Sequence, residues 1–172
     1  MSSTAANCFA VVLATACTFG YAPTASATET RSEAVVVARL YKDFGWQAFA
    51  TQQELFGKDI SHQGEAVLKR YFTPALTDLL MKDAACQIKY QGICNLDADI
   101  LFDSQDPRLV DLDVQTVGSG KVSVTFKDPV TGERTQIDFD MSRVLGTWKI
   151  ADIIYPAHEN LSLRKLLSKK VQ

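Results

Sequence analysis

Four stretches of alternating apolar and polar residues decide the fold class: VDLDV (110–114), VSVTF (122–126), IDFDM (137–141) and WKIADIIY (148–155). A period of two sends neighbouring side chains to opposite faces, so each stretch predicts a β-strand with one buried face. Turn sequences separate the stretches, among them Gly118-Ser119-Gly120 and the loop at 128–132. This spacing is typical of an antiparallel meander, and we expect a curved sheet of about four strands.

The part of the chain before these strands has the three- and four-residue apolar spacing of helices. One helix is expected over residues 32–56, with a bend at Gly45. A second is expected over residues 64–82, and it should divide at Pro74, where Thr73 is a good N-cap.

A last, basic helix is expected at residues 160–171. Helices that cover one apolar face of an antiparallel sheet give an α+β domain. A helix laid across a strongly curved sheet leaves a cone-shaped space beneath it. Side chains fill that space, or it forms a pocket for a ligand.

The composition indicates one ordered domain with no preference for nucleic acid. The chain has 172 residues, of which 47% are hydrophobic, and its formal net charge is −2. This length suits a single domain with a sizeable core. The charge is nearly balanced and no basic stripe is visible, so we expect no binding to nucleic acid.

The N-terminus has the pattern of an export signal. No charged residue precedes Glu29, an apolar run covers residues 9–16, and Ala25-Ser26-Ala27 offers the small residues that a signal peptidase accepts. We expect a signal peptide at 1–27, cleaved after Ala27, and a single domain at 28–172 in the periplasm or outside the cell. The first residues lack Lys and Arg, which departs from the usual pattern. The alternative is a lipoprotein anchored at Cys17, and only this lipid would bring the chain to a membrane.

Cleavage would leave two cysteines, Cys86 and Cys94. In an oxidising compartment an even number of cysteines favours a disulfide, which here would close a short loop. A metal-binding pair is the competing interpretation, but no Cys/His ligand set surrounds these residues. We expect a disulfide, no metal and no cofactor.

An acidic segment supplies the first candidate site. It combines four carboxylates with an amide: Asp97, Asp99, Asp103, Gln105 and Asp106. A calcium-binding EF-hand would need glycine and glutamate where Phe102 and Arg108 stand, so the segment does not fit that motif. Two interpretations stay open. The polar side chains face a ligand, or an aspartate caps a short turn whose apolar residues plug the core.

Asp152 is the second candidate. Strict alternation along 148–155 would place it on the core face with Trp148. A buried carboxylate has a raised pKa and can serve as a general base, here together with Tyr41 of the first helix. The other interpretation puts Asp152 at the rim of the sheet, bonded to an arginine or to backbone. The residues that would line a ligand pocket are therefore Tyr41, Asp97, Asp99, Gln105, Asp106, Trp148 and Asp152, and none is assigned a catalytic role.

Several motifs are shared with a known family: YFTPAL (71–76), DADIL (97–101), SQDP (104–107), VSVTF (122–126) and TWKIADI (147–153). With these motifs the chain resembles the DUF3828 family of exported bacterial proteins and lipoproteins, over roughly residues 32–155. The strand motifs are general to NTF2-like proteins, and the acidic segment is the more specific part. The resemblance implies an NTF2-like, or cystatin-like, cone and, by analogy, a homodimer. It implies no reaction, because this fold hosts enzymes, binding proteins and scaffolds.

The first hypothesis for function is an exported, non-catalytic binding or protein-interaction domain, such as an immunity protein against a secreted toxin. Its partner face would be the side of the sheet opposite the core, where alternation places Asp111, Asp113, Asp138 and Asp140. The alternative is a small-molecule enzyme or ligand-binding protein that uses the cone pocket, and convergence of Asp99, Asp106 and Asp152 in one cavity would favour it. A third hypothesis is an envelope scaffold whose cone is filled by side chains.

Overall fold

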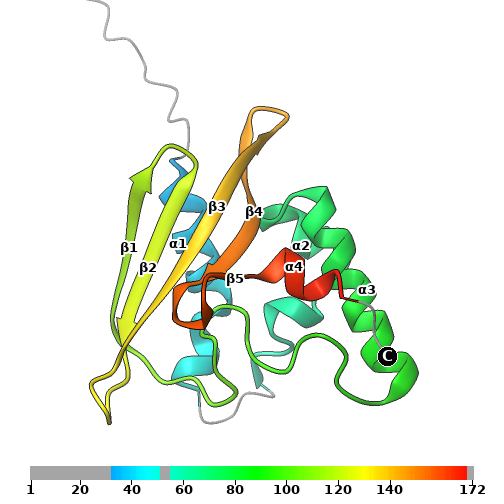
Figure 1. Cartoon of the computed structure of the whole chain (residues 1–172), viewed down its shortest axis with the longest axis horizontal. Helices are drawn as coiled ribbons and strands as arrows, with labels where there is room; N and C mark the ends of the chain where they lie inside the picture. The colour runs from blue at the N-terminus through cyan, green and yellow to red at the C-terminus, as the bar shows by residue number, and fades with distance from the viewer. Residues whose placement is uncertain (1–31, 51–54, 170–172) are drawn as a thin grey trace, which may run out of the picture.

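The structure of the protein is a computed structural model that describes residues 32–50 and 55–169. Figure 1 shows the α+β arrangement: three helices come first, an antiparallel sheet follows, and a short helix ends the chain. The predicted signal peptide at 1–27, with Cys17, lies outside the described residues. Within those ranges no helix is long and apolar enough to cross a membrane.

Five antiparallel strands form one sheet in the order of the sequence: β1 (Val110–Gly118), β2 (Lys121–Lys127), β3 (Arg134–Val144), β4 (Thr147–Tyr155) and β5 (Leu161–Ser162). The four predicted strands are confirmed, and β5 adds a two-residue strand that pairs with the end of β4. Leu145 and Gly146 join β3 to β4 with φ values of 50° and 79°. Two positive φ values in a two-residue hairpin match the twist of the flanking strands.

A β-bulge in β4 changes which side chains face the core. Asp152 pairs with Asp140, and the ladder then skips Ala151. Beyond the bulge Ile153 is buried, while Asp152 lies on the opposite face. The prediction that Asp152 shares the core face with Trp148 is therefore wrong, because one extra residue reverses the faces of a strand.

The edge strand β1 contains a second bulge, between Val110 and Asp113. Asp111 adopts a positive φ of 55° there, and the alternation before Val114 is lost. Val110 and Leu112 are exposed, and Val114 alone is partly buried in β1. The buried face expected for the first strand is thus much smaller than the sequence pattern predicts.

The α-helices are α1 (Glu33–Phe44), α2 (Glu65–Tyr71), α3 (Pro74–Tyr90) and α4 (Leu163–Leu167). Short 3-10 helices are found at η1 (Gly45–Ala48), η3 (Ile60–His62) and η4 (Pro156–His158). The bend at Gly45 is confirmed, but α1 ends at Phe44 instead of near residue 56. The final helix is also shorter than the expected 160–171. Apolar spacing overestimates helix length where the chain continues as a 3-10 turn.

The predicted division at Pro74 is confirmed. Thr73 caps α3, and its Oγ1 accepts a hydrogen bond from the backbone N of Leu76 at 3.4 Å. α3 then continues to Tyr90, beyond the predicted end at residue 82. The extension carries Cys86, which forms the expected disulfide with Cys94.

The space between α1 and the sheet is filled by aromatic side chains. Tyr41 of α1 makes edge-to-face contacts with Phe102 and Phe139, with ring centroids 5.8 and 6.1 Å apart. Phe102 in turn contacts Phe126 of β2 at 5.9 Å. Edge-to-face pairs of this kind pack at the density of a protein interior, so this part of the cone holds side chains and not a pocket.

Candidate functional site

The acidic segment borders a surface hollow of about 200 Å³. Its polar lining residues come from the segment, the end of β4 and η4: Asp97, Asp99, Asp103, Tyr155 and His158. The Nε2 of His158 lies 2.7 Å from the Oδ2 of Asp103, which places an ion pair in the lining. Two predicted site residues, Asp97 and Asp99, therefore share one surface with a histidine that the sequence pattern did not connect to them.

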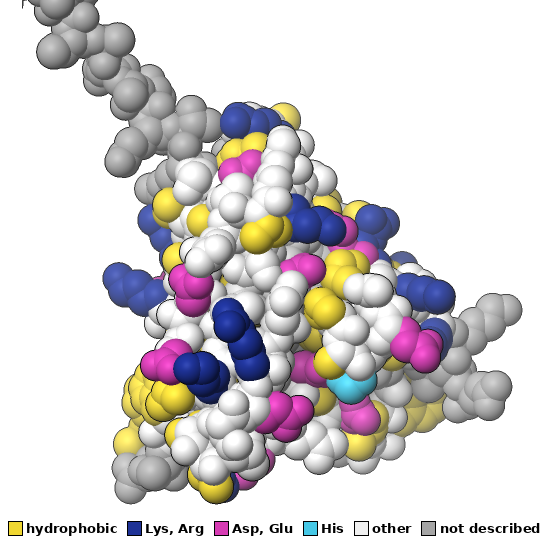
Figure 2. All heavy atoms as spheres, turned by 60° about the vertical axis from the view of Figure 1, so that its left-hand side comes forward, with side chains coloured by type: hydrophobic (Ala, Val, Ile, Leu, Met, Phe, Trp, Pro, Cys, Tyr) yellow, Lys and Arg dark blue, Asp and Glu magenta, His cyan; other side chains and the backbone are white. Residues whose placement is uncertain are grey.

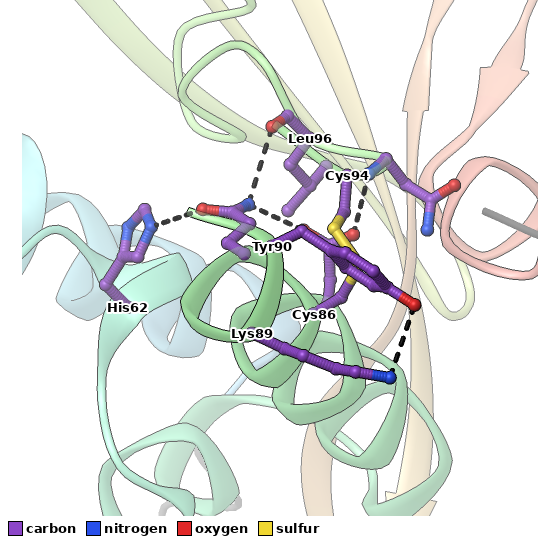
Figure 3. Close-up of a disulfide and its surroundings, with 9 residues drawn as sticks. His62, Cys86, Lys89, Tyr90, Cys94 and Leu96 are labelled. Atoms are coloured by element: carbon purple, nitrogen blue, oxygen red, sulfur yellow. Dashed lines mark hydrogen bonds between the residues drawn. A yellow bond between two sulfur atoms is a disulfide. The ribbon is translucent and has the colours of Figure 1, made fainter. Parts of the chain in front are cut away.

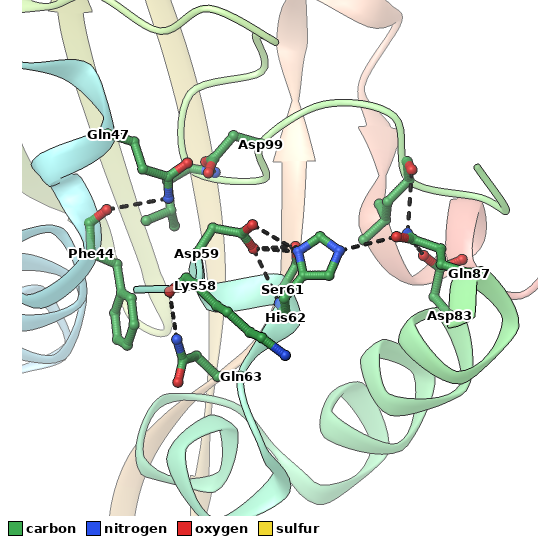
Figure 4. Close-up of polar contacts among 12 residues, drawn as sticks. Phe44, Gln47, Lys58, Asp59, Ser61, His62, Gln63, Asp83, Gln87 and Asp99 are labelled. Carbon is green, nitrogen blue, oxygen red and sulfur yellow. Dashed lines mark hydrogen bonds and ion pairs between the residues drawn. The ribbon is translucent and has the colours of Figure 1, made fainter. Parts of the chain in front are cut away.

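Asp99 and Asp103 are the half-buried carboxylates of this hollow, and Asp99 is the one that takes part in capping a turn. Its Oδ1 accepts a hydrogen bond from the backbone N of Leu101 at 2.7 Å. Burial raises the pKa of Asp99 to about 6, although hydrogen bonds from Leu101 and Gln47 act in the opposite direction. Figure 4 shows the Gln47 side chain of η1 facing this carboxylate. A group with such a pKa changes its charge just below neutral pH.

The same hydrogen bonds give Asp99 a structural role. It caps the turn that carries residues 100–102, all of which are buried. The hydroxyls of Tyr41 and Tyr155 each donate a hydrogen bond to a carbonyl of this turn, at 2.6 and 3.1 Å. The turn therefore plugs the interior, as one of the two interpretations of the acidic segment predicts, and the hydroxyl of Tyr41 points into the core.

The other predicted pocket residues lie apart from the hollow. Gln105 and Asp106 are exposed, and Asp106 pairs with Arg108 at 3.1 Å. The Trp148 ring lies under the guanidinium of Arg143, 4.6 Å from the ring centroid. None of these three predicted residues lines the hollow beside Asp99, so that hollow does not bring together all the pocket residues expected from the sequence.

Asp152 organises the last elements of the chain. Its carboxylate accepts hydrogen bonds from the Oγ of Ser162 at 2.6 Å and from the backbone N of Arg164 at 3.0 Å. These bonds attach β5 and the first turn of α4 to β4, as the rim interpretation predicts. The lining of the hollow beside Asp99 includes neither Asp106 nor Asp152, so the convergence that a cone-pocket enzyme would need does not occur there.

A second polar cluster, which sequence reasoning missed, surrounds His62 of η3 (Figure 4). The Nδ1 of His62 lies 2.7 Å from the Oδ2 of Asp59, and its Nε2 lies 3.0 Å from the Oε1 of Gln87. Gln87 also donates to the Oδ2 of Asp83 at 2.8 Å. Burial alone would lower the pKa of His62, but the bond to Gln87 and the charge and bond of Asp59 outweigh it, and the pKa is raised.

The His62 cluster contains the residue types of a serine-hydrolase triad in the wrong arrangement. In a triad the serine and the aspartate contact opposite ring nitrogens. Here the Oγ of Ser61 donates to Asp59 and lies 3.2 Å from the Nδ1 of His62, the same nitrogen that contacts Asp59. The cluster therefore holds η3 against α3 and does not activate a nucleophile. Only the Asp-x-x-His spacing was visible in the sequence, since Gln87 lies 25 residues away.

Within the described ranges no group of three His, Cys, Asp or Glu side chains has the geometry of a metal site. Comparison with family models, with curated proteins and with solved structures finds no match to this chain. The candidate function therefore rests on the chain's own geometry: a plugged interior, shallow hollows beside Asp99 and His62, and the exposed face of the sheet.

Proposed function

We propose that the chain is an exported, non-catalytic binding or protein-interaction domain of the DUF3828 type, with an immunity-type role as its most specific form. The observation that carries this proposal is the plugged interior. Tyr41, Phe102 and Phe139 fill the space under the sheet, and both buried phenols are already bonded to backbone carbonyls. These side chains occupy the space in which a cone-pocket enzyme would hold its substrate between two converging polar groups, as acid–base catalysis requires.

Export is supported by the disulfide between Cys86 and Cys94 together with the signal-like sequence at 1–27. Disulfides persist in oxidising compartments and are rare in the cytosol. We place the mature chain, residues 28–172, in the periplasm or outside the cell. Alternatively, the chain is exported as a lipoprotein that is anchored to a membrane by a lipid at Cys17.

The partner surface in this proposal is the outer face of the sheet, defined by Asp113, Gln115, Thr125, Gln136 and Asp138. These residues lie in register across β1, β2 and β3, opposite the buried positions. Gln115 donates to Asp113 at 2.6 Å, and Gln136 donates to Asp138 at 3.0 Å. Figure 2, in which the β1 and β2 side of the molecule faces the viewer, shows acidic and basic side chains interspersed with other polar groups.

Pre-ordered side chains favour a specific partner, because less conformational entropy is lost when the partner binds. Interspersed charge of both signs also favours one complementary surface over general attraction. Two acidic residues beside the outer face have lysine partners: Asp111 with Lys127 at 2.9 Å and Asp140 with Lys121 at 3.5 Å. Asp113 and Asp138 are bonded to glutamine amides instead of lysines, so these are the carboxylates that we expect to meet cationic side chains of the partner.

The test is capture of partners from an envelope extract by the disulfide-bonded chain 28–172, repeated with the purified partner. We expect a stoichiometric protein partner whose binding weakens at least about tenfold in Asp113→Lys and Asp138→Lys, since like charges oppose each other across the interface. Asp78→Lys, an equal charge change on α3, is the matched control and should bind normally. A partner that binds all three variants equally would contradict the outer face as its site.

A ligand-binding role at the 200 Å³ hollow is the second candidate, favoured by the pKa of Asp99, which burial raises to about 6. A carboxylate of that kind would accept a hydrogen bond from a small ligand. In the capture experiment this role predicts no protein partner and a small bound mass. That mass should be lost in Asp99→Asn.

A further inference from the structure

The end of α3 and the loop after it expose three large apolar side chains. Ile88, Tyr90 and Ile93 are 72%, 63% and 71% exposed. Isolated apolar residues are common on protein surfaces, but three within six residues at one turn form a patch. We call residues 88–93 the apolar tip. Figure 1 shows this end of α3 at a corner of the molecule, on the side away from β1.

The apolar tip is held in this exposed position by covalent and polar bonds (Figure 3). The disulfide between Cys86 and Cys94 closes the loop. The Oδ1 of Asp83 accepts a hydrogen bond from the backbone N of Asn95 at 2.8 Å, and Gln91 takes the left-handed conformation that ends α3. The apolar side chains therefore cannot turn inward to join the core, and they are pre-organised for contact with something outside the molecule.

Two lysines, Lys58 and Lys89, lie beside the apolar tip. The Nζ of Lys89 lies 4.8 Å from the centroid of the Tyr90 ring and donates to its hydroxyl at 3.3 Å. Lys58 and Ile88 line a hollow of about 440 Å³ beside the tip. Two nearby carboxylates are already paired: the buried Asp83 bonds to Asn95 and Gln87, and Asp59 bonds to His62.

We propose that the apolar tip docks the protein on an anionic membrane surface. Ile88, Tyr90 and Ile93 would enter the headgroup region, while Lys58 and Lys89 would lie beside lipid phosphates. Apolar and aromatic side chains with flanking lysines are the composition of interfacial membrane anchors. The cores of protein interfaces are depleted of lysine, so the same residues fit a protein partner less well. The tip lies away from the outer face of the sheet, so the two surfaces can act independently.

The experiment is co-sedimentation of the purified, disulfide-bonded chain 28–172 with vesicles of phosphatidylcholine, alone or mixed with phosphatidylglycerol. We expect binding to the mixed vesicles that weakens as salt is added. Ile88→Ser combined with Ile93→Ser should weaken binding about tenfold or more, because the inserted apolar area is lost. Lys58→Gln and Lys89→Gln should each weaken it about fivefold.

Leu145→Ser and Val130→Ser are the matched controls, because these residues are 101% and 74% exposed on hairpin turns elsewhere. Both should bind vesicles like the unchanged chain, and all variants should keep its circular dichroism spectrum. Failure to bind the mixed vesicles, or equal binding by the Ile88/Ile93 double variant, overturns the proposal. The proposal would also be overturned if a purified protein bound the chain through the tip while the vesicles did not bind. The tip would then be a site for a protein partner.

Discussion

Two neighbouring loops of this protein place their apolar residues in opposite ways. The turn at 99–103 buries residues 100–102 in the core and leaves carboxylates at the surface. The loop at 86–94, closed by the disulfide, exposes its apolar side chains. At each loop a carboxylate accepts a backbone N–H: Asp99 accepts from Leu101 within the first, and Asp83 accepts from Asn95 next to the second. Similar local bonds therefore serve two purposes: one loop completes the core, and the other presents an outward surface.

The largest expected effect is on the buried loop. Phe102→Ala should lower the free energy of unfolding by about 3–5 kcal/mol, because it removes a buried ring that contacts Tyr41 and Phe126. Ile93→Ala in the exposed loop should change it by less than about 0.5 kcal/mol. Urea denaturation followed by circular dichroism measures both. Equal losses in the two variants would show that the loops do not differ as described.

The disulfide supplies the next largest effect. Replacing Cys86 and Cys94 together by Ser should cost about 2.5 kcal/mol, since the unfolded chain regains the freedom of the closed loop. Amide hydrogen exchange should accelerate at Asn95 and stay unchanged at Leu101, because Asn95 directly follows Cys94 while Leu101 lies seven residues beyond the bridge. Faster exchange at both amides would contradict the independence of the two loops.

The smallest predicted effect concerns pH. The pKa of Asp99 is about 6 in the folded chain and 3.8 in the unfolded reference, so the folded state holds this proton more tightly. Stability should therefore fall as the pH rises from about 4 to about 6, by on the order of 1 kcal/mol. Asp99→Asn keeps the oxygen that caps Leu101 and lacks this titration.

Urea denaturation at pH 4 and pH 7 provides the readout for Asp99→Asn. The variant should match the unchanged chain at pH 4 and exceed it in stability at pH 7. Because other groups titrate in both proteins, the difference between them isolates Asp99. A constant difference at the two pH values would place Asp99 in solvent and not in the partly buried position described.

Much of the fold could be predicted from the sequence because strand alternation and helix-breaking residues are local signals. The four strands, the helix start at Thr73 and the bend at Gly45 all follow from such signals. The face of Asp152 could not be predicted, since the bulge at Ala151 depends on how β3 and β4 pair. The exposure of Leu112 could not be predicted either, because it follows from a bulge that depends on how β1 pairs with β2.

The candidate site was less predictable than the fold. The acidic segment was recognised as either a ligand site or a capped turn, and its spacing could not choose between them. The choice depends on Tyr41 and Tyr155, whose hydroxyls reach the turn from 60 and 55 residues away. The link between His62 and Gln87 is likewise a contact across the fold. Side chains brought together by packing leave no periodic signal in the sequence.

Native mass spectrometry of the chain isolated from its own cells tests the central claim most directly: that this is a surface-binding domain with a plugged interior. The account predicts a complex with a protein partner and no stoichiometric small bound mass. It also predicts that Asp99→Asn leaves the spectrum unchanged. A small molecule bound at one per chain and lost in Asp99→Asn would contradict the account and make the hollow beside Asp99 the functional site.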